Sequence, residues 1–374
     1  MKRTSEYPFF LMFLLFLGCS KKEETTTNRP FYLSFTPFPH EISVEAVNYA
    51  YTQIGKDADM ITHSFDEGVP WVEALSNQPF SKHVQDDWNL RKAKTPSGLK
   101  IFVQQSAISF LRTGLALYRK DSNDMPLPKP WDTIRFNHPN VKTAYLNYCK
   151  RQIDFFKPDY YGFSIEPNLL LSKNPSLWND YKEFHQYIYQ ELKKSYPALP
   201  MLYSTAGGFL LRGYEDNVNY DAQEQGQRDL LPFTDVFGVS LYIYGSKVAV
   251  NATPSDVFDK LKAFAKDKPM GMTETGFISK DLILDITPTI RVTIASNEQK
   301  QADYMTLLLE SATKHQFLFV NNFILRDYDK LWQQVGGKND ISALWRNIGL
   351  YDTNGQAKKA YPIWSSYFKR TYSR

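Results

Sequence analysis

Residues 269–277 read PMGMTETGF, a short apolar run followed by a glutamate and, two residues later, a glycine. Seven other runs of this kind occur along the chain, at residues 31–38, 58–63, 99–104, 160–165, 200–204, 236–242 and 317–323. Runs that are apolar almost throughout, rather than alternating with polar residues, are typical of parallel strands buried on both faces. We therefore expect eight parallel strands, of which residues 269–273 form the seventh.

The segments between these runs have the spacing of helices. Apolar residues recur every three or four positions in residues 141–156, 177–196, 254–265 and 297–315. Repeated strand–helix units predict an α/β protein, a single (β/α)8 TIM barrel with enlarged loops after the strands. The alternative is a doubly wound open sheet, but the sequence lacks the glycine-rich phosphate loop that such sheets carry after an early strand.

The N-terminal residues are expected to lie outside this barrel. Lys2 and Arg3 precede an apolar run at residues 9–17, which is too short to span a bilayer but suits a signal-peptide core. The Gly-Cys pair that follows resembles a bacterial lipoprotein signal, in which Cys19 is lipidated; an ordinary secretory signal is the alternative. We expect a signal peptide at residues 1–18, the lipidated Cys19 and a flexible tether at 19–30, and the barrel at 31–374.

The net charge and the two cysteines bear on the binding partners and the cellular location of the protein. The net charge of +4 is small and no dense basic stripe occurs, so nucleic acid is not an expected partner. The other cysteine, Cys149, would have no partner for a disulfide if Cys19 carries lipid. We expect an exported monomer anchored by its lipid to a bacterial membrane, on the periplasmic or cell-surface side of the outer membrane.

Polar residues gather where the expected strands end. In barrels of this class, the active site lies at the carboxyl ends of the strands. Glu166 and Glu274 stand out because each follows a run that contains no other acid. Glycoside hydrolysis needs two such groups, one to protonate the leaving oxygen and one to attack the anomeric carbon, about 5–5.5 Å apart in retaining enzymes. The fourth and seventh strands face each other across an eight-stranded barrel, so their ends suit this pair.

Several segments resemble the retaining glycoside hydrolases of clan A. Residues 160–168, YYGFSIEPN, resemble the motif of their fourth strand. Residues 272–277, MTETGF, resemble the seventh-strand motif, close to that of arabinogalactan endo-β-1,4-galactanases (glycosyl hydrolase family 53). Residues 236–244 and 348–364 resemble the sixth strand and the closing segment of the barrel.

The resemblance implies roles for individual residues in these segments. Glu166 would be the acid/base, Glu274 the nucleophile, and Tyr242 or Tyr244 would hydrogen-bond to Glu274. The chain departs from the clan at Ile165, where an Asn normally contacts the 2-hydroxyl of the sugar. The tryptophan usual in the eighth strand is also not evident, and Phe323 is the nearest aromatic residue.

Further residues at or just beyond the strand ends are candidates for contact with sugar. Trp71 and Trp178 could stack on sugar rings, with core packing as the alternative. A zinc site near His40, His63 and Asp66 is not expected, because the histidines lack metal-ligand spacing, and no cofactor is implied. The expected substrate contacts are His40, His63, Asp66, Trp71, Gln104, Asn168, Trp178, Tyr242, Tyr244, Asn322 and Asp327.

The leading hypothesis is a glycoside hydrolase that cleaves a β-linked oligo- or polysaccharide by a retaining double displacement. The alternative is a catalytically impaired lipoprotein that binds glycan at the cell surface, a reading that Ile165 motivates. A Schiff-base aldolase is less suited to the sequence, because its only candidate lysine, Lys100, lies near the start of a strand and so at the wrong end of the barrel.

Overall fold

The structure, a computed structural model, describes residues 28–249, 252–287 and 289–374. The expected signal peptide, Cys19 and most of the tether fall outside the described residues. Within these ranges, no helix has the length and apolar character needed to cross a bilayer.

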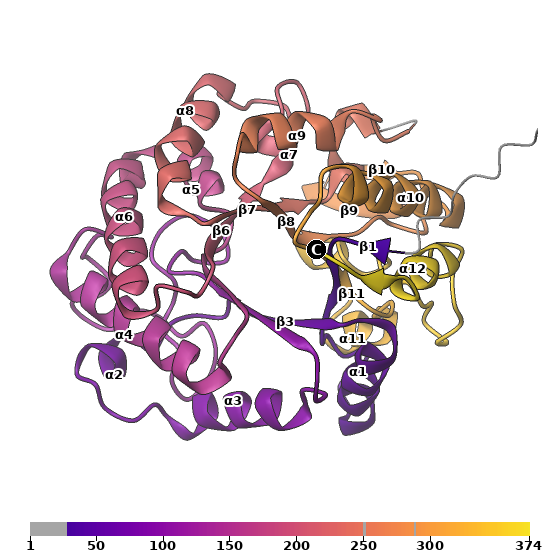
Figure 1. The fold of residues 1–374 in the computed structure, drawn as a ribbon. Coiled ribbons are helices and arrows are strands. Elements are labelled where there is room, and N and C mark those ends of the chain that lie inside the picture. The colour runs from indigo at the N-terminus through magenta and orange to yellow at the C-terminus, as the bar shows by residue number, and fades with distance from the viewer. Residues whose placement is uncertain (1–27, 250–251, 288) are drawn as a thin grey trace, which may run out of the picture.

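Eight parallel strands close into a barrel, with β11 pairing with both β2 and β8 (Figure 1). Each strand coincides with one of the eight predicted runs, so the predicted single (β/α)8 barrel is confirmed. The strands are β2 (Tyr32–Thr36), β3 (Met60–Phe65), β4 (Lys100–Gln105), β5 (Tyr160–Ser164), β6 (Met201–Ala206), β7 (Val236–Leu241), β8 (Met270–Thr275) and β11 (Phe319–Ile324).

Helices form a ring around the strands (Figure 1). They are α1 (Val44–Asp57), α2 (Trp71–Leu75), α3 (Lys82–Lys94), α4 (Pro139–Phe156), α5 (Pro167–Lys173), α6 (Trp178–Ser195), α7 (Gly207–Leu210), α8 (Tyr220–Leu230), α9 (Val257–Ala265), α10 (Glu298–Lys314), α11 (Asp329–Gln334) and α12 (Ala360–Phe368). Side-chain caps begin several of them; the Ser43 hydroxyl, for example, accepts from the backbone N–H of Ala46 at the start of α1. Long loops follow β4, β8 and β11; enlarged loops were predicted, but not the strands that carry them.

Two additions to the barrel had no counterpart in the sequence prediction. An antiparallel hairpin, β9 (Leu282–Thr287) with β10 (Ile290–Ile294), lies in the loop after β8. A short parallel pair joins β1 (Asn28–Arg29) to β12 (Thr371–Tyr372), close to where β2 begins. The buried Arg29 side chain pairs with Asp59 and donates to the backbone oxygen of Tyr367. Both ends of the described chain therefore meet at the amino-terminal end of the barrel, opposite the carboxyl ends of the strands.

Close contact between β6 and β7 requires a glycine. A Cβ atom added at Gly238 of β7 would lie 2.5 Å from the backbone oxygen of Tyr203 in β6. Because that oxygen belongs to the barrel wall, it cannot move aside easily. We expect Gly238→Ala to lower the free energy of unfolding by about 1–3 kcal/mol, as overpacking does in other cores. Urea denaturation would measure the change. In contrast, Gly245→Ala should have much less effect, since no atom lies within 4 Å of a Cβ there; equal losses would contradict the argument.

Candidate active site

Glu274 lies at the carboxyl end of β8 and is held by two hydrogen bonds. Nε2 of Gln104, from β4, donates to Oε1 of Glu274 over 2.8 Å. The hydroxyl of Tyr242, directly after β7, donates to Oε2 over 3.1 Å. Glu274 is only 8% exposed. One donor next to the neighbouring strand β7 and one from β4, across the barrel, therefore fix the orientation of a nearly buried carboxyl group.

Glu166 follows β5 by two residues and precedes α5. Its backbone is left-handed, with φ 49° and ψ 47°, and its N–H donates to the backbone oxygen of Ser204 in β6 over 3.0 Å. Non-glycine residues in this conformation cost on the order of 1–3 kcal/mol and often lie at functional sites. The conformation directs the chain sharply from strand to helix and leaves the carboxyl group at the end of the barrel.

Arg112 joins Glu166 to a third carboxyl group. The guanidinium lies 2.8 Å from Oδ2 of Asp66, directly after β3, and 3.3 Å from Oε2 of Glu166. Arg112 comes from the loop after β4 and is nearly buried. Its backbone, like that of Glu166, has a left-handed conformation, with φ 58°. Arg112 was not predicted as a site residue, because no periodic pattern or motif marks a single arginine in a long loop.

Three carboxyl groups and one guanidinium give the site an excess of negative charge. Burial raises the pKa of Glu274 to about 8, and the charges of Glu166 and Asp66 act in the same direction. The hydrogen bond from Tyr242 and the charge of Arg112 oppose this rise in pKa. Burial also raises the pKa of Asp66 to about 6, against the influence of Arg112. The raised pKa of Glu274 disfavours the ionised form that a nucleophile needs, so the competent form is favoured at higher pH.

Aromatic rings form one wall of the site. The ring of Tyr242 lies 6.1 Å from that of Phe323, at the end of β11, and 6.0 Å from that of Trp345. Trp345 also contacts Phe323, at 6.0 Å, and Phe110, at 6.4 Å. The segment after β11 thus supplies a tryptophan near the end of the eighth barrel strand, where the strand itself has none. The sequence places Trp345 in the segment after the eighth strand, but its contacts with Tyr242 and Phe323 were not predicted because it lies far along the chain from both.

Five predicted sugar contacts are corrected, because the structure buries these side chains completely: His63, Trp71, Asn168, Asn322 and Asp327. His63 points out of the barrel, where Nε2 bonds to Thr95 and the ring packs on Phe156. Trp71 packs on Trp131 and donates its indole N–H to the backbone oxygen of Ala116. None of the five has a surface that could reach a sugar.

The two buried asparagines hold backbone in place. Asn168 in α5 both donates to and accepts from the backbone of Ala206, at 3.1 and 2.9 Å, which ties α5 to the end of β6. Asn322 donates to the backbone oxygens of Ile324 and Ile348. Asn168 therefore supports Glu166 indirectly, by fixing the helix that follows it.

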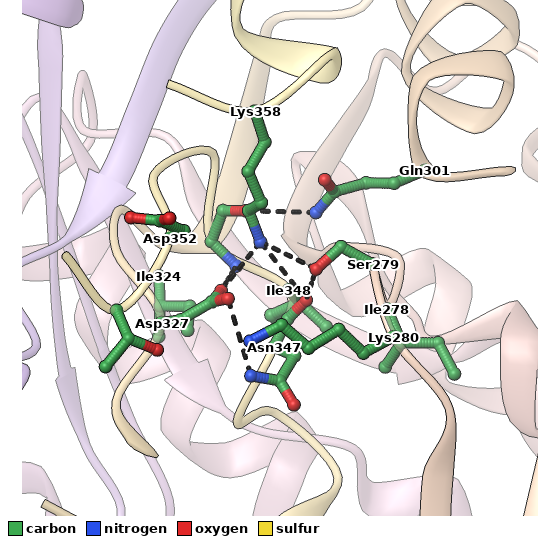
Figure 2. Close-up of polar contacts among 12 residues, drawn as sticks. Ile278, Ser279, Lys280, Gln301, Ile324, Asp327, Asn347, Ile348, Asp352 and Lys358 are labelled. Carbon is green, nitrogen blue, oxygen red and sulfur yellow. Dashed lines mark hydrogen bonds and ion pairs between the residues drawn. The ribbon is translucent and has the colours of Figure 1, made fainter. Parts of the chain in front are cut away.

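Asp327 belongs to a buried ion pair (Figure 2). Nζ of Lys358 lies 2.7 Å from Oδ1 of Asp327 and 2.9 Å from the hydroxyl of Ser279. The exposed fractions are 0% for Asp327 and 2% for the Lys358 side chain. The backbone N–H of Gly349 also donates to Asp327. Asp327 therefore anchors the closing segment of the chain against the loop after β8.

Three other predicted contacts, Tyr244, Trp178 and His40, pack on other parts of the protein. Tyr244 is buried and donates to the backbone oxygen of Leu344 over 2.8 Å, so it steadies the segment that carries Trp345. Trp178 stacks on Tyr181 in α6. His40 meets Tyr49 edge-on, at 5.4 Å. The structure thus selects Tyr242 over Tyr244 as the partner of Glu274, and in the described ranges no three His, Cys, Asp or Glu residues are grouped to hold a metal ion.

No protein-family model and no curated protein sequence matches this chain. Solved structures do match: GH5_18 from Streptomyces cattleya, in complex with Manb1-4GlcNAc, aligns over 92% of this chain and 80% of its own, with 13% identity and a TM-score of 0.62. An exo-beta-1,4-mannosidase from an Opitutaceae bacterium aligns over 91% and 59%, with 12% identity and a TM-score of 0.60. The GH53 catalytic domain of Ignisphaera aggregans aligns over 87% and 88%, with 14% identity and a TM-score of 0.54.

The chain has the same (β/α)8 barrel fold as these glycoside hydrolases. The resemblance inferred from the sequence is therefore confirmed for the fold, and the GH53 protein is one of these structural neighbours. At such low sequence identity the neighbours establish the barrel alone.

Proposed function

We propose that this protein is a retaining glycoside hydrolase that acts on a β-linked glycan. The observation that carries the proposal is the convergence of Glu166, Glu274 and Arg112 at the carboxyl ends of the barrel strands. Structural neighbours that bind Manb1-4GlcNAc or act as an exo-beta-1,4-mannosidase support a β-linked sugar as the substrate class. The lipid anchor at Cys19, export to a bacterial membrane and the monomeric state belong to the same proposal.

In the first step, the carboxylate of Glu274 attacks the anomeric carbon while Glu166 gives a proton to the departing glycosidic oxygen. Gln104 and Tyr242 hold both oxygens of Glu274, so the carboxylate is oriented before the substrate arrives. In the second step, Glu166 removes a proton from water, which displaces Glu274 from the sugar. Because displacement occurs twice at the same carbon, the product keeps the β configuration.

The proposal is tested with aryl β-mannosides, β-galactosides and β-glucosides and with the corresponding β-1,4-linked oligosaccharides. Proton NMR during the first minutes of reaction identifies the anomer that forms first. We expect the β-anomer, with the α-anomer appearing later by mutarotation. Initial formation of the α-anomer would show inversion and contradict the assignment of Glu274 as the nucleophile.

A catalytically impaired glycan-binding protein is the second candidate. Ile165, which stands where clan A has an Asn, is buried and offers no polar group to a sugar hydroxyl. Calorimetric titration with β-mannan and β-galactan oligosaccharides distinguishes the two candidates. Binding without turnover of any glycoside would favour this second function over hydrolysis.

A further inference from the structure

Arg112 is shared unequally between two carboxyl groups of the site. Its Nη1 and Nη2 atoms lie 3.1 and 2.8 Å from the two carboxylate oxygens of Asp66. A single contact of 3.3 Å joins Nη2 to Oε2 of Glu166. Bidentate pairing is stronger and more specific in geometry than one contact. Asp66 therefore holds the larger share of the positive charge.

The position of Arg112 does not depend on Glu166. The backbone N–H of Arg112 donates to the oxygen of Ser109 over 2.7 Å, and the N–H of Ser109 donates to the oxygen of Gly114 over 2.9 Å. The side chain of Asn174 ties this turn to the segment after β5 through the oxygen of Thr113, at 2.9 Å. The turn and Asp66 thus fix the guanidinium beside Glu166 in either protonation state of Glu166.

If Glu166 is to donate a proton, the positive charge of Arg112 beside it must be offset by another group. A neighbouring cation favours the ionised form of a carboxyl group, whereas the first step of the proposed reaction needs the protonated form. Two carboxyl groups also face Glu166, those of Asp66 and Glu274, and the charge of Glu166 raises the pKa of each. The hydroxyl of Tyr242 also feels the charge of Glu166. Among these groups, Arg112 alone carries positive charge.

We propose that Asp66 is a positioning residue that pairs with Arg112 and offsets its charge, which keeps Glu166 able to carry the proton for the leaving group. This inference rests on the proposed function. As the glycosidic bond breaks, the proton moves from Glu166 to the leaving oxygen, and Arg112 stabilises the carboxylate that remains. Water returns a proton to Glu166 in the second step, so the cycle closes without another reactant.

The kinetic test uses Asp66→Asn, which keeps an oxygen acceptor for Arg112 but removes the charge that competes with Glu166. For a phenyl glycoside that the wild type hydrolyses, we expect kcat/KM at pH 7 to fall about tenfold or more, and the alkaline limb of the pH profile to move to lower pH. The 2,4-dinitrophenyl glycoside should lose far less, since its leaving group departs without a proton. Adding Arg112→Gln should return the alkaline limb towards its wild-type position. Equal losses with both substrates and no recovery in the double variant would overturn the proposal.

A second readout needs no turnover. Carbon-13 NMR of labelled glutamate carboxyl groups follows the ionisation of Glu166, whose signal is assigned by its loss in Glu166→Gln. The titration midpoint should move to lower pH in Asp66→Asn and to higher pH in Arg112→Gln. Because the two variants shift it in opposite directions, either one decides the matter if the other fails to fold. An unchanged midpoint overturns the proposal, whereas shifted midpoints without turnover of any glycoside overturn the proposed hydrolase function instead.

Discussion

Glu274→Gln should abolish turnover while leaving the fold intact. Removal of a catalytic nucleophile costs on the order of 10⁴-fold or more in kcat. The amide keeps the shape of the side chain and an oxygen that accepts from Gln104, so the surrounding packing is preserved. In the smaller variant Glu274→Ala, azide should enter the vacated space and form an α-glycosyl azide from an activated β-glycoside. Full hydrolytic activity of either variant would refute the assignment.

The same Glu274→Gln variant should also be more stable than the wild type at neutral and alkaline pH. The pKa of Glu274 is about 8 in the folded protein and 4.5 as the reference value for an unperturbed Glu. Between these values the folded protein keeps a proton that the unfolded chain releases, so the wild type loses stability as pH rises. Glutamine has no such loss, and the gain should disappear below about pH 4.5.

Melting temperatures measured from pH 4 to 9 test this dependence. The difference between Glu274→Gln and the wild type should widen up to about pH 8, where the shifted pKa of Glu274 lies. The matched control is Glu310→Gln, which removes an exposed carboxylate from α10. If the melting temperatures of all three proteins change with pH in the same way, the raised pKa assigned to Glu274 would be contradicted.

Lys358→Met should destabilise the barrel strongly. The substitution leaves Asp327 fully buried without its counter-charge. Burial raises the pKa of Asp327 and lowers that of Lys358, because loss of contact with water disfavours the charged form of each group. Breaking a buried pair by removing one partner typically costs about 3–5 kcal/mol. We expect a loss of that size in the free energy of unfolding measured in urea.

The double variant Lys358→Met with Asp327→Asn separates charge from packing. Asparagine removes the stranded charge but keeps an acceptor for the N–H of Gly349. Much of the lost stability should therefore return. Lys369→Met, at an exposed position in the same part of the chain, is the control for loss of a lysine. A double variant as unstable as the single one would mean that the methionine fits poorly, and the charge argument would fail.

The eight strands could be predicted because each is a short apolar run bounded by turn or helix signals. Glu166, Glu274 and Tyr242 could be selected because strand ends in this fold converge. The same runs did not reveal which side chains face the inside of the barrel. Gln104 reaches Glu274, whereas the neighbouring Gln105 points outward to Cys149.

His63 was misplaced for this reason. In β3, Thr62 bonds to Ser34 of the neighbouring strand and Ser64 contacts Gln104, while His63 between them faces the helices. A strand that is apolar on both faces has no alternation of hydrophobic and polar residues from which to predict direction. Arg112 was missed, and the contacts of Trp345 were not predicted, for a different reason: tertiary contacts rather than local sequence bring long loops to the site.

The parallel pair of β1 and β12 determines how the fold bears a mechanical load. A pull on the chain ahead of Asn28 runs along β1, so the pairing with Thr371 and Tyr372 is loaded in shear. The contacts of Arg29 with Asp59 and the backbone of Tyr367 share the force before it reaches β2. Attachment of the N-terminus to a surface would therefore load the amino-terminal end of the barrel first, at the opposite end from the carboxyl groups of the site.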